Sequence, residues 1–245
     1  MTIFKVHSNF IYFSHIPKCA GSSIEDYFST FPACSVLFLD REFYSSSLKN
    51  WAKSSPQHIL GNVVERLFDN SFFTDYLAII REPIDRFKST FKYQKYWLKN
   101  IEEAIDCNVF VSEILPNNYQ KQDWCDNHFQ TQISFLIPNR KYKLFLMDKD
   151  GIREAKRYID QNIFAYDREI EIPRNNTAND LYSNKVEDIK LNLKSIEIIK
   201  ELYKNDFNLF KELNKKYSSL GKSFFVFSKD NFRILNNENF LLENQ

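Results

Sequence analysis

The residues best suited to chemistry lie in the segment 13–24, which reads FSHIPKCAGSSI. Its apolar start and helix-compatible end predict a strand–loop–helix unit. The first backbone amides of a helix have no internal partners and lie at the positive end of the helix dipole, so they attract anions. Small residues let a ligand approach the backbone, and serine hydroxyls and a lysine add donors and charge. The candidate anion-binding residues are Pro17, Lys18, Cys19, Ala20, Gly21, Ser22 and Ser23.

A second candidate anion site lies in the segment 79–91, IIREPIDRFKSTF. Arg81 directly follows an apolar run, and open α/β sheets bind ligands at the carboxyl ends of their strands. Pro83 favours the first turn of a helix. Ser89 lies eight residues after Arg81, about two helical turns along, so both side chains could reach one anion.

Each segment also has a simpler interpretation. The first could be an ordinary strand–turn–helix whose serine only caps the helix. The second could be a basic helix that faces solvent. Cys19 would be at a helix N-terminus, where a thiol pKa can fall, although a small loop residue is the simpler expectation.

Strands and helices that alternate along the chain must position these segments. They predict an α/β fold around a mostly parallel sheet, in a single domain over residues 1–245. The expected strands are 10–13, 35–39, 76–80 and 143–147. The expected helices are 23–31, a stretch after Pro83, most of 99–137, 152–161, and 191–210 in two pieces with a restart at Asn205 and Asp206. Residues 40–56 are expected to be loop with a possible helix and residues 174–186 to be loop, and 217–245 give weak signals.

The composition excludes several classes of protein. The 245 residues include only four glycines, and no six-residue window has two, so a dinucleotide-binding fingerprint is excluded. Gly221-Lys222-Ser223 resembles the end of a Walker A loop, but Lys216 stands where the first glycine is needed. A net charge of +1 gives no general attraction to nucleic acid. No apolar run is long enough for a membrane span or a signal peptide, so we expect a cytoplasmic protein.

The four cysteines indicate neither a metal site nor a redox motif. None has CxxC spacing, so a zinc ribbon is not expected. We expect the four cysteines to be free thiols.

Together the two segments resemble a known family. HIPKCAGSS at 15–23 is similar to the 5′-phosphosulfate loop, and REPIDRFKSTF at 81–91 to the 3′-phosphate motif, of sulfotransferases that use 3′-phosphoadenosine 5′-phosphosulfate (PAPS). The closest pattern is that of carbohydrate sulfotransferases and their bacterial relatives, the family 2 type. Weaker similarities lie at 126–132, 174–177 and 202–210, so the resemblance covers about residues 10–210 and leaves 217–245 as an extension of unclear role.

The resemblance implies a P-loop-like parallel sheet flanked by helices and transfer of a sulfuryl group from PAPS to a carbohydrate hydroxyl. Lys18 would contact the oxygen that bridges phosphate and sulfate, and residues 19–23 would surround the phosphosulfate. Arg81 and Ser89 would bind the 3′-phosphate, and Asn176 and Thr177 would help to hold the nucleotide. No metal is expected. A bacterial enzyme of polysaccharide synthesis is the implied setting, with a carbohydrate acceptor as partner.

The base that takes the acceptor proton departs from the family pattern. Many members place a Gly-His pair about twenty residues before the arginine, where this chain has Gly61-Asn62. An amide cannot act as a base near neutral pH. We favour His58, then His128, as the base; His15 and Glu65 are further candidates, and each of the four could instead be structural.

Two other functions remain open at this level. One is a P-loop-like kinase that uses ATP, which the missing second glycine disfavours. The other is an inactive relative that only binds nucleotide or glycan, which Asn62 would explain. Neither the acceptor nor the oligomeric state can be derived from the residues.

Overall fold

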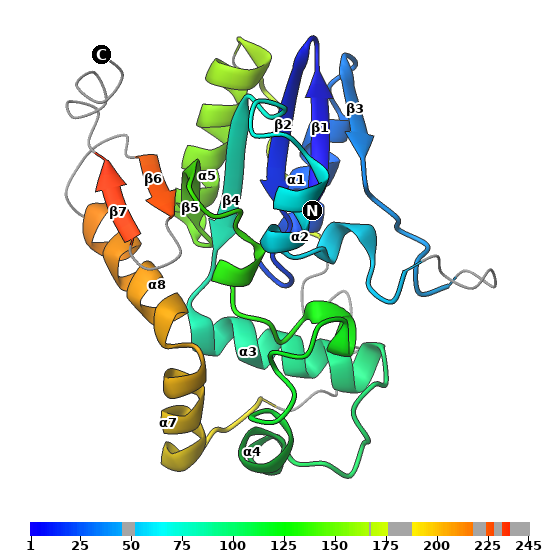
Figure 1. The fold of residues 1–245 in the computed structure, drawn as a ribbon, viewed down its shortest axis with the longest axis vertical. Coiled ribbons are helices and arrows are strands. Elements are labelled where there is room, and N and C mark those ends of the chain that lie inside the picture. The colour runs from blue at the N-terminus through cyan, green and yellow to red at the C-terminus, as the bar shows by residue number, and fades with distance from the viewer. Residues whose placement is uncertain (46–51, 167, 176–187, 218–223, 228–231, 236–245) are drawn as a thin grey trace.

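The core of the protein is an open sheet whose strands are parallel only at its centre (Figure 1). The computed structural model describes residues 1–45, 52–166, 168–175, 188–217, 224–227 and 232–235. Within these ranges the strand order is β3 (Cys34–Leu37), β1 (Thr2–Val6), β2 (Asn9–Ser14), β4 (Asp75–Ile80), β5 (Arg140–Leu146), β6 (Phe224–Phe227) and β7 (Phe232–Leu235).

The expectation of a mostly parallel sheet was wrong at both edges. β2 pairs with β4, and β4 with β5, in parallel, whereas the other pairs are antiparallel. A two-residue turn, with His7 at a φ of 54°, joins β1 to β2 and forces these strands to run in opposite directions. The α/β class itself is confirmed.

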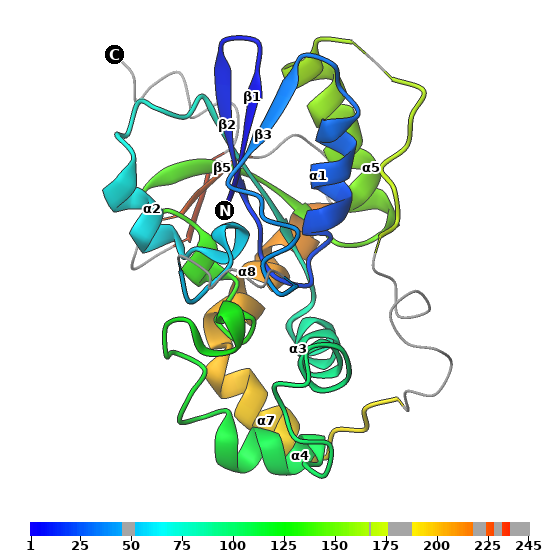
Figure 2. The same cartoon turned by 90° about the vertical axis from the view of Figure 1, so that its right-hand side faces the viewer.

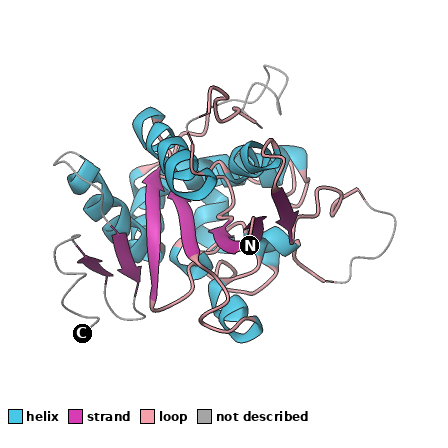
Figure 3. Ribbon diagram, turned by 90° about the horizontal axis from the view of Figure 1, so that it is seen from above, coloured by secondary structure: helices cyan, strands magenta, loops and turns pink. Residues whose placement is uncertain are grey.

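Helices cover both faces of the sheet (Figures 2 and 3). α1 (Gly21–Ser29) and α5 (Lys149–Tyr158) pack on one face through Ile24, Phe28 and Ala155. α2 (Gly61–Leu67) and α8 (Lys204–Tyr217) pack on the other. Alternate residues of β4 point to the two faces, which explains why this strand is apolar throughout.

A third layer lies beyond the carboxyl ends of the parallel strands (Figure 1). It contains α3 (Pro83–Lys92), α4 (Cys107–Val109) and α7 (Leu193–Leu202), joined by a separate aromatic cluster. α3 begins as predicted, because Pro83 occupies its first turn and the Glu82 carboxylate accepts a hydrogen bond from the Asp85 amide. The space between this layer and the sheet is where the candidate site lies.

Most sequence-predicted elements are confirmed. The strands at 10–13, 35–39, 76–80 and 143–147 and the helices at 23–31 and 152–161 are present with shifts of a few residues at their ends. The final helix is in two pieces, and the break lies at Tyr203, just before the expected restart.

The prediction that 99–137 is mostly helical was wrong. The segment contains only short helical turns: α4, Phe110–Ile114, Trp124–Asn127 and Ile133–Phe135. Left-handed backbone at Asp123, Cys125, Asp126 and Asn127 interrupts any longer helix. β1 was not predicted either, nor were β6 and β7, which extend the sheet beyond β5.

No helix in the described ranges combines the length and the apolar character that crossing a membrane requires.

Gly61 is required by the close contact between α2 and the segment that follows the short helix at 133–135. A Cβ at this position would lie 2.2 Å from the carbonyl oxygen of Leu136. We expect Gly61→Ala to destabilise the protein by about 1–3 kcal/mol, because the clashing atom is backbone and cannot rotate away. Denaturant unfolding would measure this, with Asn62→Ala, which changes an exposed residue of the same helix, as the control. Equal unfolding midpoints for the two variants would show that packing against Leu136 does not require a glycine at position 61.

Candidate active site

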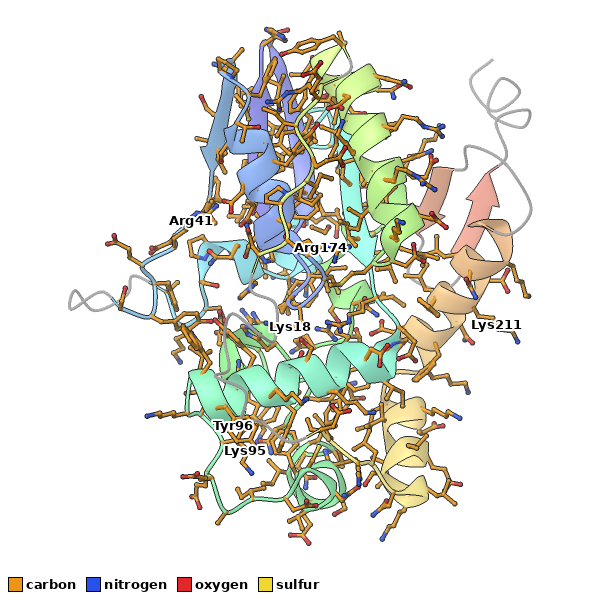
Figure 4. All side chains as sticks on the ribbon, turned by 180° about the vertical axis from the view of Figure 1, so that it is seen from behind. Lys18, Arg41, Lys95, Tyr96, Arg174 and Lys211 are labelled. Atoms are coloured by element: carbon orange, nitrogen blue, oxygen red, sulfur yellow. The ribbon has the colours of Figure 1, made fainter. Side chains whose placement is uncertain are left out.

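One large pocket opens at the carboxyl edge of the sheet and brings the two predicted segments together. Its volume is about 1290 Å³. The sequence-predicted residues that line it are Lys18, Ala20, Gly21, Ser22, Ser23, His58, Arg81, Ser89 and His128. Figure 4 shows Lys18 between α3 and the sheet layer.

The loop after β2 presents the N-terminus of α1 to this pocket. Lys18 and Ala20 have φ angles of 65° and 59°, so the chain makes its tight turn without a glycine at either position. α1 then begins at Gly21, and its N-cap residue is an alanine, which has no side-chain acceptor for the first amides. The first backbone amides of α1 therefore remain available to donate hydrogen bonds to an anion.

Packing against His15 also requires a glycine at position 21. A Cβ on Gly21 would lie 2.3 Å from Nε2 of His15, so the missing side chain makes room for this imidazole ring.

Lys18 supplies the mobile charge of the loop. Its Nζ lies 4.1 Å from the ring centroid of Tyr93, which holds the ammonium at the pocket. Burial, followed by the charge of Arg81, lowers the pKa of Lys18 to about 8. The ammonium is therefore poorly solvated, and an anionic ligand would stabilise it.

The Arg81 side chain is hydrogen-bonded directly to the loop that contains Lys18. The Arg81 guanidinium donates to the carbonyl oxygen of Lys18 at 3.1 Å. The side-chain amide of Gln132 accepts from the Arg81 amide and donates to its carbonyl oxygen, both at 2.9 Å. The same Gln132 oxygen accepts from the thiol of Cys19 at 3.4 Å. Gln132 thus fixes the starts of both candidate anion sites relative to each other.

Two further residues, for which the sequence analysis predicted no role, hold this arrangement. Arg86, 3% exposed, donates to the carbonyl oxygens of Pro17 and His128 at 3.1 and 3.0 Å. Asp206, fully buried, accepts from the amide of Gln132 at 2.7 Å. Arg86 lies in the segment 81–91 and Asp206 in the segment 202–210, both of which resemble family motifs. Their places in these motifs were the available signal, but their hydrogen-bond partners are far away in the sequence.

Cys19 is a buried residue of the loop. Burial raises the pKa of its thiol to about 11, which removes the thiolate at neutral pH. All four cysteines are free thiols, as expected.

His58 forms a buried pair with a carboxylate. Its Nδ1 lies 2.6 Å from Oδ2 of Asp126. Asp126 also accepts from the Ser55 hydroxyl at 2.8 Å, from the Ser55 amide at 2.7 Å and from the Tyr44 hydroxyl. A carboxylate can only accept, so Nδ1 of His58 is the donor and Nε2 is the nitrogen that remains for a substrate proton.

The charge states of this pair suit a base. Burial alone would raise the pKa of Asp126, but His58, His128 and the Tyr44 hydroxyl hold it well below its ordinary value. Burial lowers the pKa of His58 despite the opposing effect of Asp126, so the imidazole is neutral near pH 7.

His128 lies beside this pair with different partners. The centroid of its ring is 4.7 Å from that of His58, and the ring stacks on Tyr93 with a centroid distance of 5.3 Å. Its Nδ1 donates to the carbonyl oxygen of Cys125 at 3.0 Å, and Oδ2 of Asp126 is 4.0 Å away. His128 therefore lacks the close carboxylate that would stabilise a protonated ring.

His58, Asp126 and His128 are also close enough to suggest a metal site, since their ligand atoms lie within 4.8 Å of one another. The geometry favours a hydrogen-bonded network instead. Asp126 already accepts several hydrogen bonds, and both Nδ1 atoms are used as donors.

The remaining candidates separate clearly. Asn62 and Glu65 are exposed on α2 and do not line the pocket, whereas His15 does. Asn176 and Thr177 lie outside the described residues. The preceding residue Asn175 does reach α1, because its amide donates to the Ser23 hydroxyl at 3.2 Å.

These features define an α/β protein whose strand–loop–helix site and histidine–carboxylate pair share one pocket at the sheet's carboxyl edge. Residues 1–212 match the model of the sulfotransferase family, of the family 2 type, and the chain belongs to this family. No curated protein and no solved structure matches the chain. Family membership confirms the resemblance and assigns sulfotransfer as the general activity.

Proposed function

We propose that this protein transfers the sulfuryl group of PAPS to a hydroxyl of a carbohydrate acceptor. The observation that carries the proposal is the shared pocket. It contains a helix N-terminus with a lysine and an arginine on one side and a neutral, carboxylate-paired histidine on the other. Anion binding and proton removal are the two tasks that sulfuryl transfer to a hydroxyl requires.

The donor side fits the charges of PAPS. Lys18, the hydroxyls of Ser22 and Ser23 and the first amides of α1 would hold the phosphosulfate. Arg81 and Ser89, both at the pocket, would hold the 3′-phosphate. The single-domain organisation and the contribution of Asn176 and Thr177 remain predictions.

The chemistry places each residue in a role. When bound, PAPS supplies the sulfuryl group: the acceptor oxygen bonds to sulfur as the bond to the bridging phosphate oxygen breaks. Lys18 and the α1 amides stabilise negative charge on the leaving oxygen where it develops. Nε2 of His58 accepts the hydroxyl proton, and Asp126 stabilises the imidazolium and fixes its orientation.

The pocket has room for two substrates. Its volume of about 1290 Å³ exceeds the range of about 300–1,000 Å³ that is usual for one small ligand. Tyr44 and Gln57 line its His58 side with polar groups that could bind sugar hydroxyls. The carbohydrate acceptor and a cytoplasmic role in bacterial polysaccharide synthesis are inferred from family resemblance and complete the proposal.

Two assays test the proposal. Adenosine 3′,5′-bisphosphate, the product nucleotide, is expected to raise the melting temperature, and labelled PAPS with a panel of glycans is expected to yield sulfated product. If the protein does not bind the bisphosphate, the proposal is refuted. Stabilisation by ATP and magnesium instead would favour a kinase, and bisphosphate binding without transfer to any glycan would favour an inactive relative.

The pH dependence of kcat/KM for the donor is expected to be bell-shaped. Activity rises with pH as His58 loses its proton, because only the neutral imidazole accepts a proton. This rise should lie below pH 6.5, since burial lowers the pKa of His58 from its ordinary value of 6.5. Activity falls again near pH 8 as Lys18 loses its charge.

Lys18→Arg provides the test for the alkaline limb. Its guanidinium stays charged, so whatever activity this variant keeps should no longer fall near pH 8. An unchanged alkaline limb in Lys18→Arg would show that another group titrates.

A further inference from the structure

A second histidine–carboxylate pair, which the proposed mechanism does not use, lines the same pocket. Nδ1 of His15 lies 2.5 Å from Oε1 of Glu25, and both side chains are buried. Thr2 donates its hydroxyl hydrogen to the same carboxylate oxygen at 2.5 Å. A buried carboxylate with two donors is a built feature of the site rather than a surface contact.

Glu25 fixes which edge of the His15 ring faces the substrate. Burial alone would raise the pKa of Glu25, but the charge and hydrogen bond of His15 and the hydrogen bond of Thr2 lower it. Glu25 is therefore a carboxylate that can only accept, so Nδ1 of His15 must donate. Nε2, on the opposite edge of the ring, remains for another partner.

The position of Nε2 is defined from two sides. It lies against Gly21, the first residue of α1, where a Cβ would be 2.3 Å away. The ring of His58 is 5.0 Å from the ring of His15 at an angle of 79°. His15 therefore lies between the helix N-terminus that would hold the donor anion and the base that would activate the acceptor.

We propose that His15 is a further catalytic residue, whose Nε2–H donates a hydrogen bond to a sulfuryl oxygen, and that Glu25 positions it. The proposal rests on the proposed function. During in-line transfer the sulfuryl group must lie between the leaving phosphate oxygen and the acceptor oxygen, which is the region that His15 borders. This hydrogen bond makes and breaks no covalent bond, so it adds no atom and no proton to the reaction.

The product nucleotide separates this role from simple donor binding, because adenosine 3′,5′-bisphosphate lacks the sulfuryl group. His15→Ala is expected to lower kcat by about 10²-fold, the loss typical of one such donor, and Glu25→Gln by about 10-fold. Both are expected to keep bisphosphate affinity within about threefold of wild type. His15→Gln, whose amide can donate from a similar position, should recover part of the kcat that His15→Ala loses.

Controls separate catalysis from folding. Ser29→Ala, at the far end of α1, should leave kcat unchanged, and Glu25→Gln keeps the shape of the side chain if His15→Ala does not fold. The acidic limb of the pH profile should persist in His15→Ala, because it belongs to His58. Loss of that limb would make His15 the base and overturn the inference.

Other outcomes also decide. Unchanged kcat in these variants, or bisphosphate affinity that falls as much as kcat, would overturn the inference while wild-type transfer still supports the proposed function. A wild-type protein that does not bind the bisphosphate would overturn both.

Discussion

Replacing Lys18 with alanine is expected to lower kcat for sulfuryl transfer by about 10²–10³-fold while the protein stays folded. The ammonium is the mobile positive charge of the loop and lies at the pocket, 4.1 Å from the ring centroid of Tyr93. Its loss removes stabilisation that is needed most as charge builds on the leaving oxygen. Single-turnover transfer from labelled PAPS at saturating acceptor would measure the effect.

The fold should tolerate this change. Lys18 is only partly buried, and the contacts that hold the loop come from Arg81 and Arg86 to its backbone carbonyls. Lys200→Ala, which removes an exposed lysine from α7, is the matched control and should retain full activity. A Lys18→Ala enzyme within about fivefold of wild type would remove Lys18 from the catalytic machinery.

Replacing His58 with asparagine is expected to lower kcat by about 10²–10⁴-fold, the range typical of a lost general base. The acidic limb of the pH profile should disappear with it, since the residue that titrates there is gone. Asp126→Asn should also lower kcat strongly, because the amide can no longer stabilise the imidazolium of His58. Steady-state kinetics across pH, with PAPS saturating, would measure both effects.

Three variants distinguish His58 from its rivals. His128→Asn should cost less, because its ring has backbone carbonyls rather than a close carboxylate as partners. Asn62→Ala and Glu65→Gln should leave kcat unchanged, because both residues are exposed outside the pocket. A larger loss in His128→Asn than in His58→Asn would transfer the role of base to His128.

The parts of the site that follow from local sequence could be predicted. The apolar run of β4 and the Pro83 that opens α3 place Arg81 at a strand end. The short apolar run of β2 followed by small residues places Lys18 before a helix. In both cases neighbouring residues determine the backbone, so a pattern of a dozen residues carries the information.

The rest depends on contacts between distant segments. His58 and Asp126 are 68 residues apart, and Asp126 reaches His58 through left-handed backbone that no periodicity indicates. Gln132 joins Arg81 and Cys19 from a segment for which a helix was predicted. Gly21 also has a packing role that could not be foreseen, because the ring of His15, six residues earlier, fills its missing side-chain position.

The buried guanidinium of Arg86 has a consequence for reading this motif in other chains. Arg81 and Arg86 stand five residues apart in one short motif, yet only Arg81 lines the pocket. Arg86 is sequestered by backbone carbonyls of two separate loops. Selection on binding and selection on architecture would therefore both preserve an arginine here. In a homologue that no longer binds the sulfuryl donor but keeps its fold, the Arg81 guanidinium would retain only its contact to the Lys18 carbonyl, so Arg81 should vary more than Arg86. The two positions together would then be a marker of lost activity.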